Sequence, residues 1–278
     1  MKKLSRRKFI QLCSGTAASL GFMGSTLAAM PAAPHLPRPG SFLRFDELTM
    51  HDHRIFRGFH AFSFGTARTE IIGSNGTGKS TIAELLATHD PADNGRTNVT
   101  LRVSPEGSES VLRRHRELVH VRDDYQLRTT MLRRLSANPA LSALEEAASE
   151  YILRFFPHAH VLLKRHRPLD ILKGAWGGYG TSVAAAWAFL LAERDTVNYR
   201  LPLVLDDPFG SMDSELRRAF SALVSPLETQ VILLTSEYQL RDSGWPGWRA
   251  LDEIPRPETR EMRGALRLDG SRNRYFLS

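Results

Sequence analysis

The stretch Gly73-Ser-Asn-Gly-Thr-Gly-Lys-Ser80 (GSNGTGKS) follows the apolar pair Ile71-Ile72 and precedes a helix-like run over residues 81–87. Its spacing is G-x-x-x-x-G-K-[ST], the pattern of a phosphate-binding loop between a strand and a helix. The glycines let the backbone curl so that successive N–H groups point at phosphate oxygens, and the following helix adds the positive end of its dipole. A chance match is the alternative, but the strand, loop and helix order argues against it.

Each side chain of this loop has an expected role. Lys79 reaches the terminal phosphates of a nucleotide, and the hydroxyl of Ser80 is a ligand for Mg²⁺. The sequence therefore predicts ATP and Mg²⁺ as cofactors. The residues predicted to bind the nucleotide here are Gly73, Ser74, Asn75, Gly76, Thr77, Gly78, Lys79, Ser80 and Thr81.

A second motif lies one domain length further along the chain. The apolar run 201–205 has the composition of a buried strand and ends in Asp206-Asp207-Pro208-Phe209. In nucleotide hydrolases with such a loop, an acid after a buried strand holds Mg²⁺. We predict Asp206 as this metal-binding acid and Asp207 as the residue that orients or deprotonates the attacking water. Lys79 and Asp207 are thus the predicted catalytic pair, although a D-D-P turn after a strand would explain the segment alone.

Four ordered segments, together with the phosphate loop, resemble the RecF/SMC group of ABC-type ATPases. Residues 42–64 look like the opening strands of that group, and 177–192 like its signature motif with the helix that follows. LPLVLDDPFGSMD, residues 201–213, resembles the Walker B motif and D-loop, and 230–235 the next strand. The resemblance implies an α/β P-loop NTPase fold, an ABC-type ATPase head with a mixed sheet and a small helical lobe.

The resemblance also implies further site residues and partners. Gly177 and Gly178, at the signature position, would bind nucleotide, and Asp213, at the D-loop position, would contact a second subunit. A nucleotide-dependent homodimer or a partner ATPase subunit is therefore expected. The group's roles in DNA repair, maintenance and defence would extend to this chain.

The chain departs from the family pattern at three places. Ala175-Trp176 stands where the signature LSGG has its first two residues, so the serine that would touch a partner's nucleotide is missing. Thr235-Ser236 stands where a switch histidine is common, and Asp207 where many relatives have Glu. Gln126 is only a weak candidate for the Q-loop glutamine, and a solvated Gln is the favoured interpretation. These departures put dimer-based catalysis in doubt.

An insert over about residues 105–170 separates the phosphate loop from the signature position. We expect a strand over 98–104, a hairpin over 111–122, and helices over 127–156 that break near Asn138-Pro139. The insert lacks sustained heptads, which predicts a compact lobe without long coiled-coil arms. The positions expected in its core, because they recur at helical spacing, are Leu141, Leu144, Ala148, Tyr151 and Ile152.

Arginines gather in three parts of this insert, at 113–116, 133–134 and 164–167. Such clusters can neutralise DNA phosphates, so DNA is a predicted partner. An ordinary solvated charged face with scattered acids is an equally open alternative.

The N-terminus conflicts with an ATPase assignment. Ser5-Arg-Arg-Lys-Phe-Ile10 and the weakly apolar stretch 12–29 resemble a twin-arginine export signal, so we assign residues 1–31 as a leader, 32–40 as a Pro-rich linker and 41–278 as the ATPase domain. The formal net charge is +7, of which the leader holds five basic residues and no acid, leaving 7 − 5 = +2 for the rest. Membrane contact is expected only through the leader.

Localisation stays open at this stage. ATPase chemistry predicts the cytoplasm, with Met30 as an alternative start, whereas a genuine leader predicts the periplasm or a tether to the inner membrane. The main functional expectation is Mg-dependent ATP hydrolysis. A non-hydrolysing nucleotide- or partner-binding module is the alternative, and a small-molecule kinase is disfavoured because kinases need no D-loop.

Overall fold

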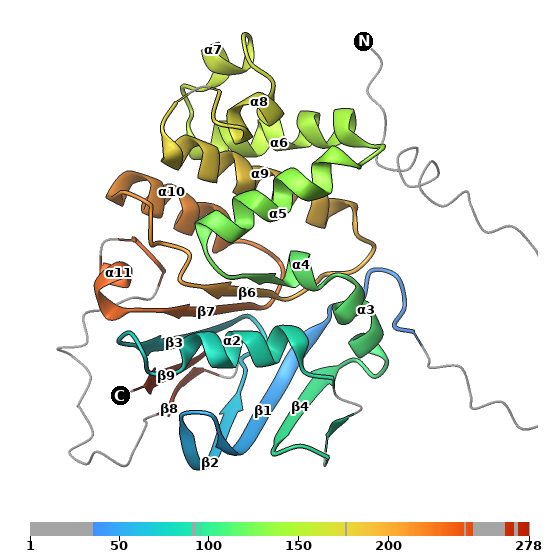
Figure 1. Ribbon diagram of the computed structural model, residues 1–278, viewed down its shortest axis with the longest axis vertical. Coiled ribbons are helices and arrows are strands. Elements are labelled where there is room, and N and C mark those ends of the chain that lie inside the picture. The colour runs from blue at the N-terminus through green and yellow to red at the C-terminus, as the bar shows by residue number, and fades with distance from the viewer. Residues whose placement is uncertain are drawn as a thin grey trace, which may run out of the picture. The chain divides into compact units, whose positions relative to one another are not determined.

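The structure is a computed structural model that describes residues 36–90, 93–94, 96–175, 177–241, 243–246, 265–269 and 272–277. The predicted leader, the first part of the linker and Trp176 lie outside the described residues. The predicted α/β P-loop fold with a mixed sheet and a helical lobe is confirmed. Figure 1 shows the six-stranded sheet between a helical lobe and a smaller three-stranded sheet.

The larger sheet has the strand order β5-β6-β7-β3-β9-β8. Its strands are β3 (Arg68–Gly73), β5 (His120–Val121), β6 (Leu203–Asp206), β7 (Val231–Thr235), β8 (Ala265–Asp269) and β9 (Arg272–Leu277). All neighbours pair in parallel except β8 and β9, which pair antiparallel. Every residue of β3, β6 and β7 is buried, as expected for parallel strands covered on both faces.

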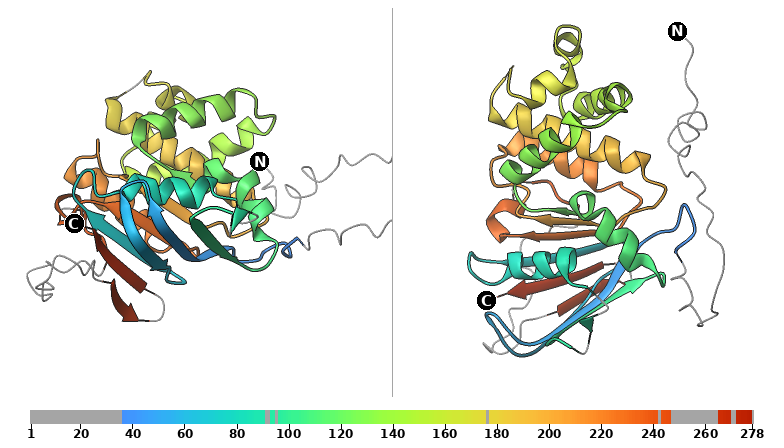
Figure 2. Two further views of the ribbon diagram at one scale, coloured as in Figure 1. Left: turned by 60° about the horizontal axis from the view of Figure 1, so that its bottom comes forward. Right: turned by 45° about the vertical axis from the view of Figure 1, so that its right-hand side comes forward.

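The smaller sheet is antiparallel and has the order β2-β1-β4. It consists of β1 (Arg44–His53), β2 (Phe56–Ser63) and β4 (Val99–Ser104), which agree with the predicted opening strands and with the strand predicted over 98–104. Helix α2 (Lys79–Thr88) follows the phosphate loop. Figure 2 shows this small sheet and the helical lobe at opposite ends of the described domain.

The helical lobe packs around one buried helix, α9 (Tyr179–Thr196). All side chains from Ser182 to Glu193 are buried, because α5 (Asp124–Ser136), α6 (Leu141–Phe155) and α8 (Pro168–Leu172) surround it. A helix that is apolar on all sides is expected to be central. The remaining helices are α3 (Ser108–Arg114), α4 (Arg116–Val119), α7 (His160–Leu163), α10 (Ser214–Val224) and α11 (Glu237–Arg241). None of the helices in the described part of the chain is long and apolar enough to cross a membrane.

The helical break predicted near Asn138-Pro139 is confirmed. Helix α5 ends at Ser136 and α6 begins at Leu141, and the side-chain carbonyl of Asn138 accepts a hydrogen bond from the backbone N–H of Ala140 at 2.8 Å. Of the predicted stripe, three residues are fully buried and two are partly buried. The buried three are Leu144, Ala148 and Ile152, and the others are Leu141 and Tyr151.

The hairpin predicted over 111–122 is wrong. The segment forms α3, α4 and the two-residue strand β5. Its buried apolar pairs, Val111-Leu112 and Leu118-Val119, are seven residues apart, which is close to two helical turns. Gly107, the N-cap of α3, has a positive φ of 82°.

A buried ion pair joins the C-terminal strand to the centre of the sheet. Glu70 of β3 and Arg274 of β9 are direct partners in the strand register. The Nε of Arg274 donates to Glu70 at 3.0 Å, and their side chains are only 3% and 4% exposed. The indole N–H of Trp245 donates to the other carboxylate oxygen at 3.1 Å. Three groups therefore satisfy each other in the core.

We expect Arg274→Ala to lower the free energy of unfolding by about 3–5 kcal/mol, because it leaves the Glu70 carboxylate buried without its cation. Arg241→Ala is the matched control, since Arg241 forms an exposed ion pair with Glu237 on one helix at 2.9 Å. Its loss should be about 0.3–0.5 kcal/mol. Urea unfolding measures both, and similar small losses would contradict the structural importance of the buried pair.

Candidate nucleotide-binding site

The phosphate loop joins β3 to α2 and depends on its glycines. Gly76 and Gly78 have φ values of +85° and +95°, which side chains rarely adopt. A Cβ on Gly78 would lie 2.6 Å from the Cζ of Phe56, so the small sheet closes directly on the loop. Thr77 donates its hydroxyl to the carbonyl of Ser74 at 2.9 Å and tightens the turn. The loop therefore has the curled backbone that the motif predicts.

Lys79 spans this loop from the first turn of α2. Its Nζ donates to the carbonyls of Gly73 at 2.8 Å and Ser74 at 2.9 Å. An ammonium has three N–H donors, so one is left for a phosphate. Burial lowers the pKa of Lys79, and the carboxylates of Asp207 and Asp206 act in the opposite direction. The structure thus brings the predicted lysine and both predicted acids together.

Asp206 and Ser80 form the oxygen pair predicted to hold the metal. Asp206 ends β6 and is only 2% exposed. Burial raises the pKa of Asp206, while a hydrogen bond with Ser80 lowers it. Hard oxygen donors of this kind suit Mg²⁺, which is usually held by one or two protein groups together with phosphates and water. In the described residues no cluster of three acidic, His or Cys side chains could hold a metal by itself.

Asp207 stands in an unusual backbone conformation. Its φ is +57°, and its backbone N–H donates to the carbonyl of Leu234 in β7 at 2.9 Å. Aspartate tolerates this left-handed region better than most residues, but it still costs about 1 kcal/mol or more. The turn leaves the Asp207 carboxylate exposed at the edge where Lys79 lies. Such outliers gather at functional sites, which is consistent with the predicted role of Asp207.

Asp124, which was not among the residues predicted from the sequence, belongs to the same site. It opens α5, is only 5% exposed, and accepts hydrogen bonds from the backbone N–H of Ser211 at 3.1 Å and from its hydroxyl. Its Oδ1 is buried with no hydrogen-bond partner among the described residues. Burial raises the pKa of Asp124, the Ser211 bonds oppose this, and Asp123 and Asp207 add to the rise.

The signal that points to Asp124 is its position just after β5, which pairs in parallel with β6. The carboxyl end of β5 therefore lies at the same edge of the sheet as Asp206. The weak Q-loop candidate Gln126 lies instead in the first turn of α5 with an exposed side chain.

The residues expected to bind nucleotide at the signature position, and the one expected to contact a second subunit at the D-loop position, have local roles within this chain. Gly177 has a φ of +80° and Gly178 is the N-cap of α9. The side chain of Asp213 caps α10 by accepting from the backbone N–H of Leu216 at 2.8 Å. At the switch position, Thr235 donates to the side chain of Gln239 at 2.6 Å. The nucleotide-binding role of the two glycines and the partner contact of Asp213 stay predictions.

Most of the predicted arginine clusters are paired within the chain. Arg113 binds Asp90, and Arg167 binds Asp170 at 3.3 Å. Two arginines of α5 and one carboxylate from each of α4 and α9 form a further network. Its members are Arg133, Arg134, Glu117 and Glu193. The alternative of a charged face neutralised by nearby acids therefore applies to much of the insert.

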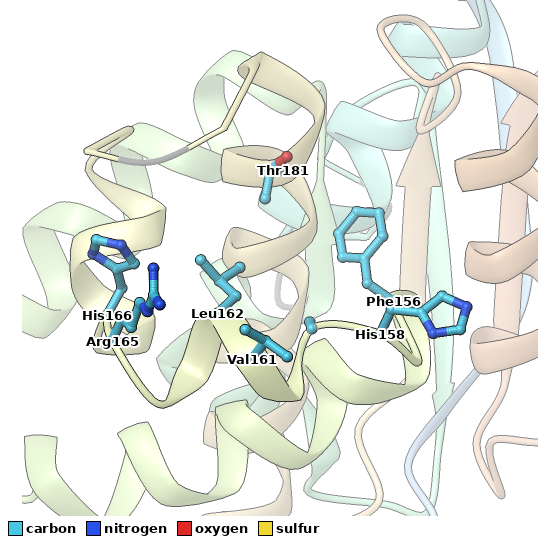
Figure 3. Close-up of a pocket in the computed structure, with 8 residues that line it drawn as sticks. Phe156, His158, Val161, Leu162, Arg165, His166 and Thr181 are labelled. Atoms are coloured by element: carbon cyan, nitrogen blue, oxygen red, sulfur yellow. The ribbon is translucent and has the colours of Figure 1, made fainter.

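A separate cavity of about 390 Å³ lies in the helical lobe (Figure 3). Apolar side chains fill its middle, with Arg165 and His166 together on one side and His158 on another. Thr181, from the first turn of α9, also lines it. The phosphate loop contributes no residue to this cavity, so it is distinct from the nucleotide site.

One family and several solved structures are similar to this chain. The family described as ABC transporter matches residues 64–173, less than half of the chain, including the phosphate loop. A search of curated proteins finds no match. The SMC head domain from Thermotoga maritima is 16% identical, with a TM-score of 0.46, over 72% of this chain and 92% of that one.

A bacterial Atm1-family ABC exporter with ATP bound is also 16% identical, with a TM-score of 0.42. The likeness covers 77% of this chain and 37% of the exporter chain. With the strand order and the loop geometry, the family match supports one structural conclusion. The described domain has an α/β P-loop NTPase fold that fits an ABC-type ATPase head.

Gly78→Ala should destabilise the protein more than Gly76→Ala does. Both glycines have a similar positive φ, but a Cβ at Gly76 meets nothing within 4 Å, whereas one at Gly78 meets Phe56. The clash adds about 1–3 kcal/mol to the shared backbone cost. Urea unfolding of the two variants tests this, and equal losses would show that the small sheet does not constrain the loop.

Asp124→Asn should reveal the cost of burying this carboxylate. Burial raises the folded pKa of Asp124 above the ordinary aspartate value of 3.8, so the carboxyl contributes stability below pH 3.8. That stability is lost as the pH rises through the folded pKa. The asparagine can still accept from Ser211 but does not titrate. The stability of the wild type relative to the variant should therefore fall with rising pH, by up to about 1.4 kcal/mol per unit. Urea unfolding from pH 4 to 8 measures this, and a rising difference would contradict it.

Proposed function

We propose that this protein binds ATP with Mg²⁺ and hydrolyses it. The observation that carries the proposal is the meeting of Lys79, Ser80 and Asp206 at one edge of the parallel sheet. These three residues come from two motifs more than a hundred positions apart. The ABC transporter family match over the phosphate loop supports the same chemistry.

Each residue has a distinct role in the proposed reaction. The backbone amides of residues 76–80 and the free N–H of Lys79 would hold the phosphates and stabilise the charge that develops during in-line transfer. Ser80 and Asp206 would place Mg²⁺, which neutralises phosphate charge when bound. The exposed carboxylate of Asp207 would orient the attacking water and take its proton.

Hydrolysis of ATP by the purified full-length chain, with and without Mg²⁺, tests this proposal. Lys79→Ala should abolish tight ATP binding. Asp207→Asn should keep binding and lower turnover by roughly 10²- to 10⁴-fold, the usual contribution of a general base. Asp195→Asn is the matched control, since Asp195 lies on α9 and accepts from Tyr151 at 2.6 Å.

The control should leave turnover unchanged. Full activity in Asp207→Asn would remove this residue from the mechanism. ATP binding without any turnover in the wild type would favour the non-hydrolysing binding module, to which the missing signature serine already points.

We also propose, as the finer part of this function, a RecF/SMC-like role in which ATP drives dimerisation and DNA maintenance or defence. Exposed arginines that form no ion pair in the described part of the chain, such as Arg114 and Arg165, support contact with DNA phosphates. Stimulation of turnover by DNA and an ATP-dependent doubling of mass on size-exclusion chromatography would support it.

This role places the protein in the cytoplasm, and cell fractionation tests the location. Recovery of a shortened chain from the periplasm would overturn the DNA-linked part, because it would make the leader a genuine export signal. ATP hydrolysis itself would still be measured independently.

A further inference from the structure

A polar cavity of about 310 Å³ lies at the end of α2 that is remote from the phosphate loop. Thr88, in its wall, is nine residues after Lys79, roughly 13 Å along a helix that rises 1.5 Å per residue. Residues of α4, β5 and α5 complete the wall. The lining residues are Ala87, Thr88, Arg116, Glu117, His120, Val121, Arg122, Gln126, Leu127 and Thr130. No residue of the phosphate loop lines this cavity, although Arg122 lies close enough to the nucleotide site to lower the pKa of Asp206.

Two exposed arginines reach this cavity without an acidic partner. Arg116 lies on α4 and Arg122 directly follows β5, and neither forms an ion pair with any acid among the described residues. Their neighbour Arg113, by contrast, is paired with Asp90. Arg116 and Arg122 are two of several arginines in this part of the chain that form no ion pair among the described residues, and both line this one cavity. Their positive charge is available to a ligand.

The single acid in the wall does not cancel this charge. Both carboxylate oxygens of Glu117 are bound, one by Arg133 and the other by Arg134 at 2.9 Å. Burial raises the pKa of Glu117, but the hydrogen bonds from the two arginines outweigh it and the pKa is lowered overall. Glu117 therefore stays ionised and compensated by cations of α5, and the cavity is basic.

His120 supplies a further polar atom. Its Nε2 is buried and has no hydrogen-bond partner in the described structure. Burial lowers the pKa of His120 to about 4, so the ring is neutral near pH 7. A buried polar atom without a partner costs free energy that a ligand could recover. The side chains of Gln126 and Thr130 add neutral donors around it.

We propose that this cavity binds a phosphate group, independently of the ATP site. Two guanidinium groups give forked, charge-assisted hydrogen bonds that match a tetrahedral oxyanion, and the neutral donors complete its coordination. The phosphate comes either from a small phosphorylated molecule or from the backbone of a nucleic acid. Both sources share the same recognition chemistry.

Inorganic phosphate is the probe, and full-length Lys79→Ala is the background, so that binding at the phosphate loop does not confuse the result. Line broadening in ³¹P NMR and the thermal shift on adding phosphate report binding. Introducing Arg116→Ala and Arg122→Ala together into this background should weaken phosphate binding at least tenfold, because each substitution removes charge-assisted hydrogen bonds. Both side chains are exposed, so the fold should persist, and the melting temperature without phosphate checks this.

The matched control adds Arg114→Ala to the same background. Arg114 is a neighbouring exposed arginine that does not line the cavity, so phosphate affinity should not change. A DNA oligonucleotide that displaces phosphate identifies a nucleic acid as the source, and no displacement identifies a small molecule. Absence of phosphate binding, or equal binding after the double substitution, would overturn the proposal. These outcomes do not depend on whether the chain hydrolyses ATP.

Discussion

The parallel register of β3, β7 and β6 is the constraint on which the site depends. Ile72 pairs with Thr235, and Asp206 pairs with Leu234, so all three strands end at the same edge of the sheet. The phosphate loop and the two acids leave the sheet at this edge. Because each strand is entirely buried, a slip in register would expose apolar side chains to water. The core therefore fixes the distance between the lysine and the carboxylates.

The turns at this edge are supported from both sides. Asp207 keeps its positive φ while its backbone N–H is bound to β7. Gly78 adopts its positive φ without strain, and Phe56 from the small sheet packs so closely on it that a side chain would clash. The two sheets hold the reactive groups in place, and this pre-organisation is what electrostatic catalysis needs.

The parts of the site that could be predicted from sequence are those in which the chemistry is local. The phosphate loop and Asp206-Asp207 can each be recognised from a few consecutive residues. Asp124 could not be found this way, because its partner Ser211 is 87 positions away and its burial depends on the folded lobe. The buried pair of Glu70 and Arg274 is 204 positions apart and was missed for the same reason. The failed hairpin at 111–122 shows the limit of short apolar runs, which fit helix and strand alike.

Hydrogen bonds connect the helical lobe to the turn that contains Asp207. Asp124 ties the start of α5 to Ser211, four residues after Asp207. One turn later on α5, Arg128 donates to the carbonyls of Leu172 and Lys173, both at 3.1 Å, in the segment that leads to Gly177. Ser182 of α9 also donates to Leu172 at 2.6 Å. Burying the Asp124 carboxylate costs free energy, because one of its oxygens has no hydrogen-bond partner among the described residues. The packing of α5 on α9 offsets this cost and keeps Asp124 in contact with Ser211.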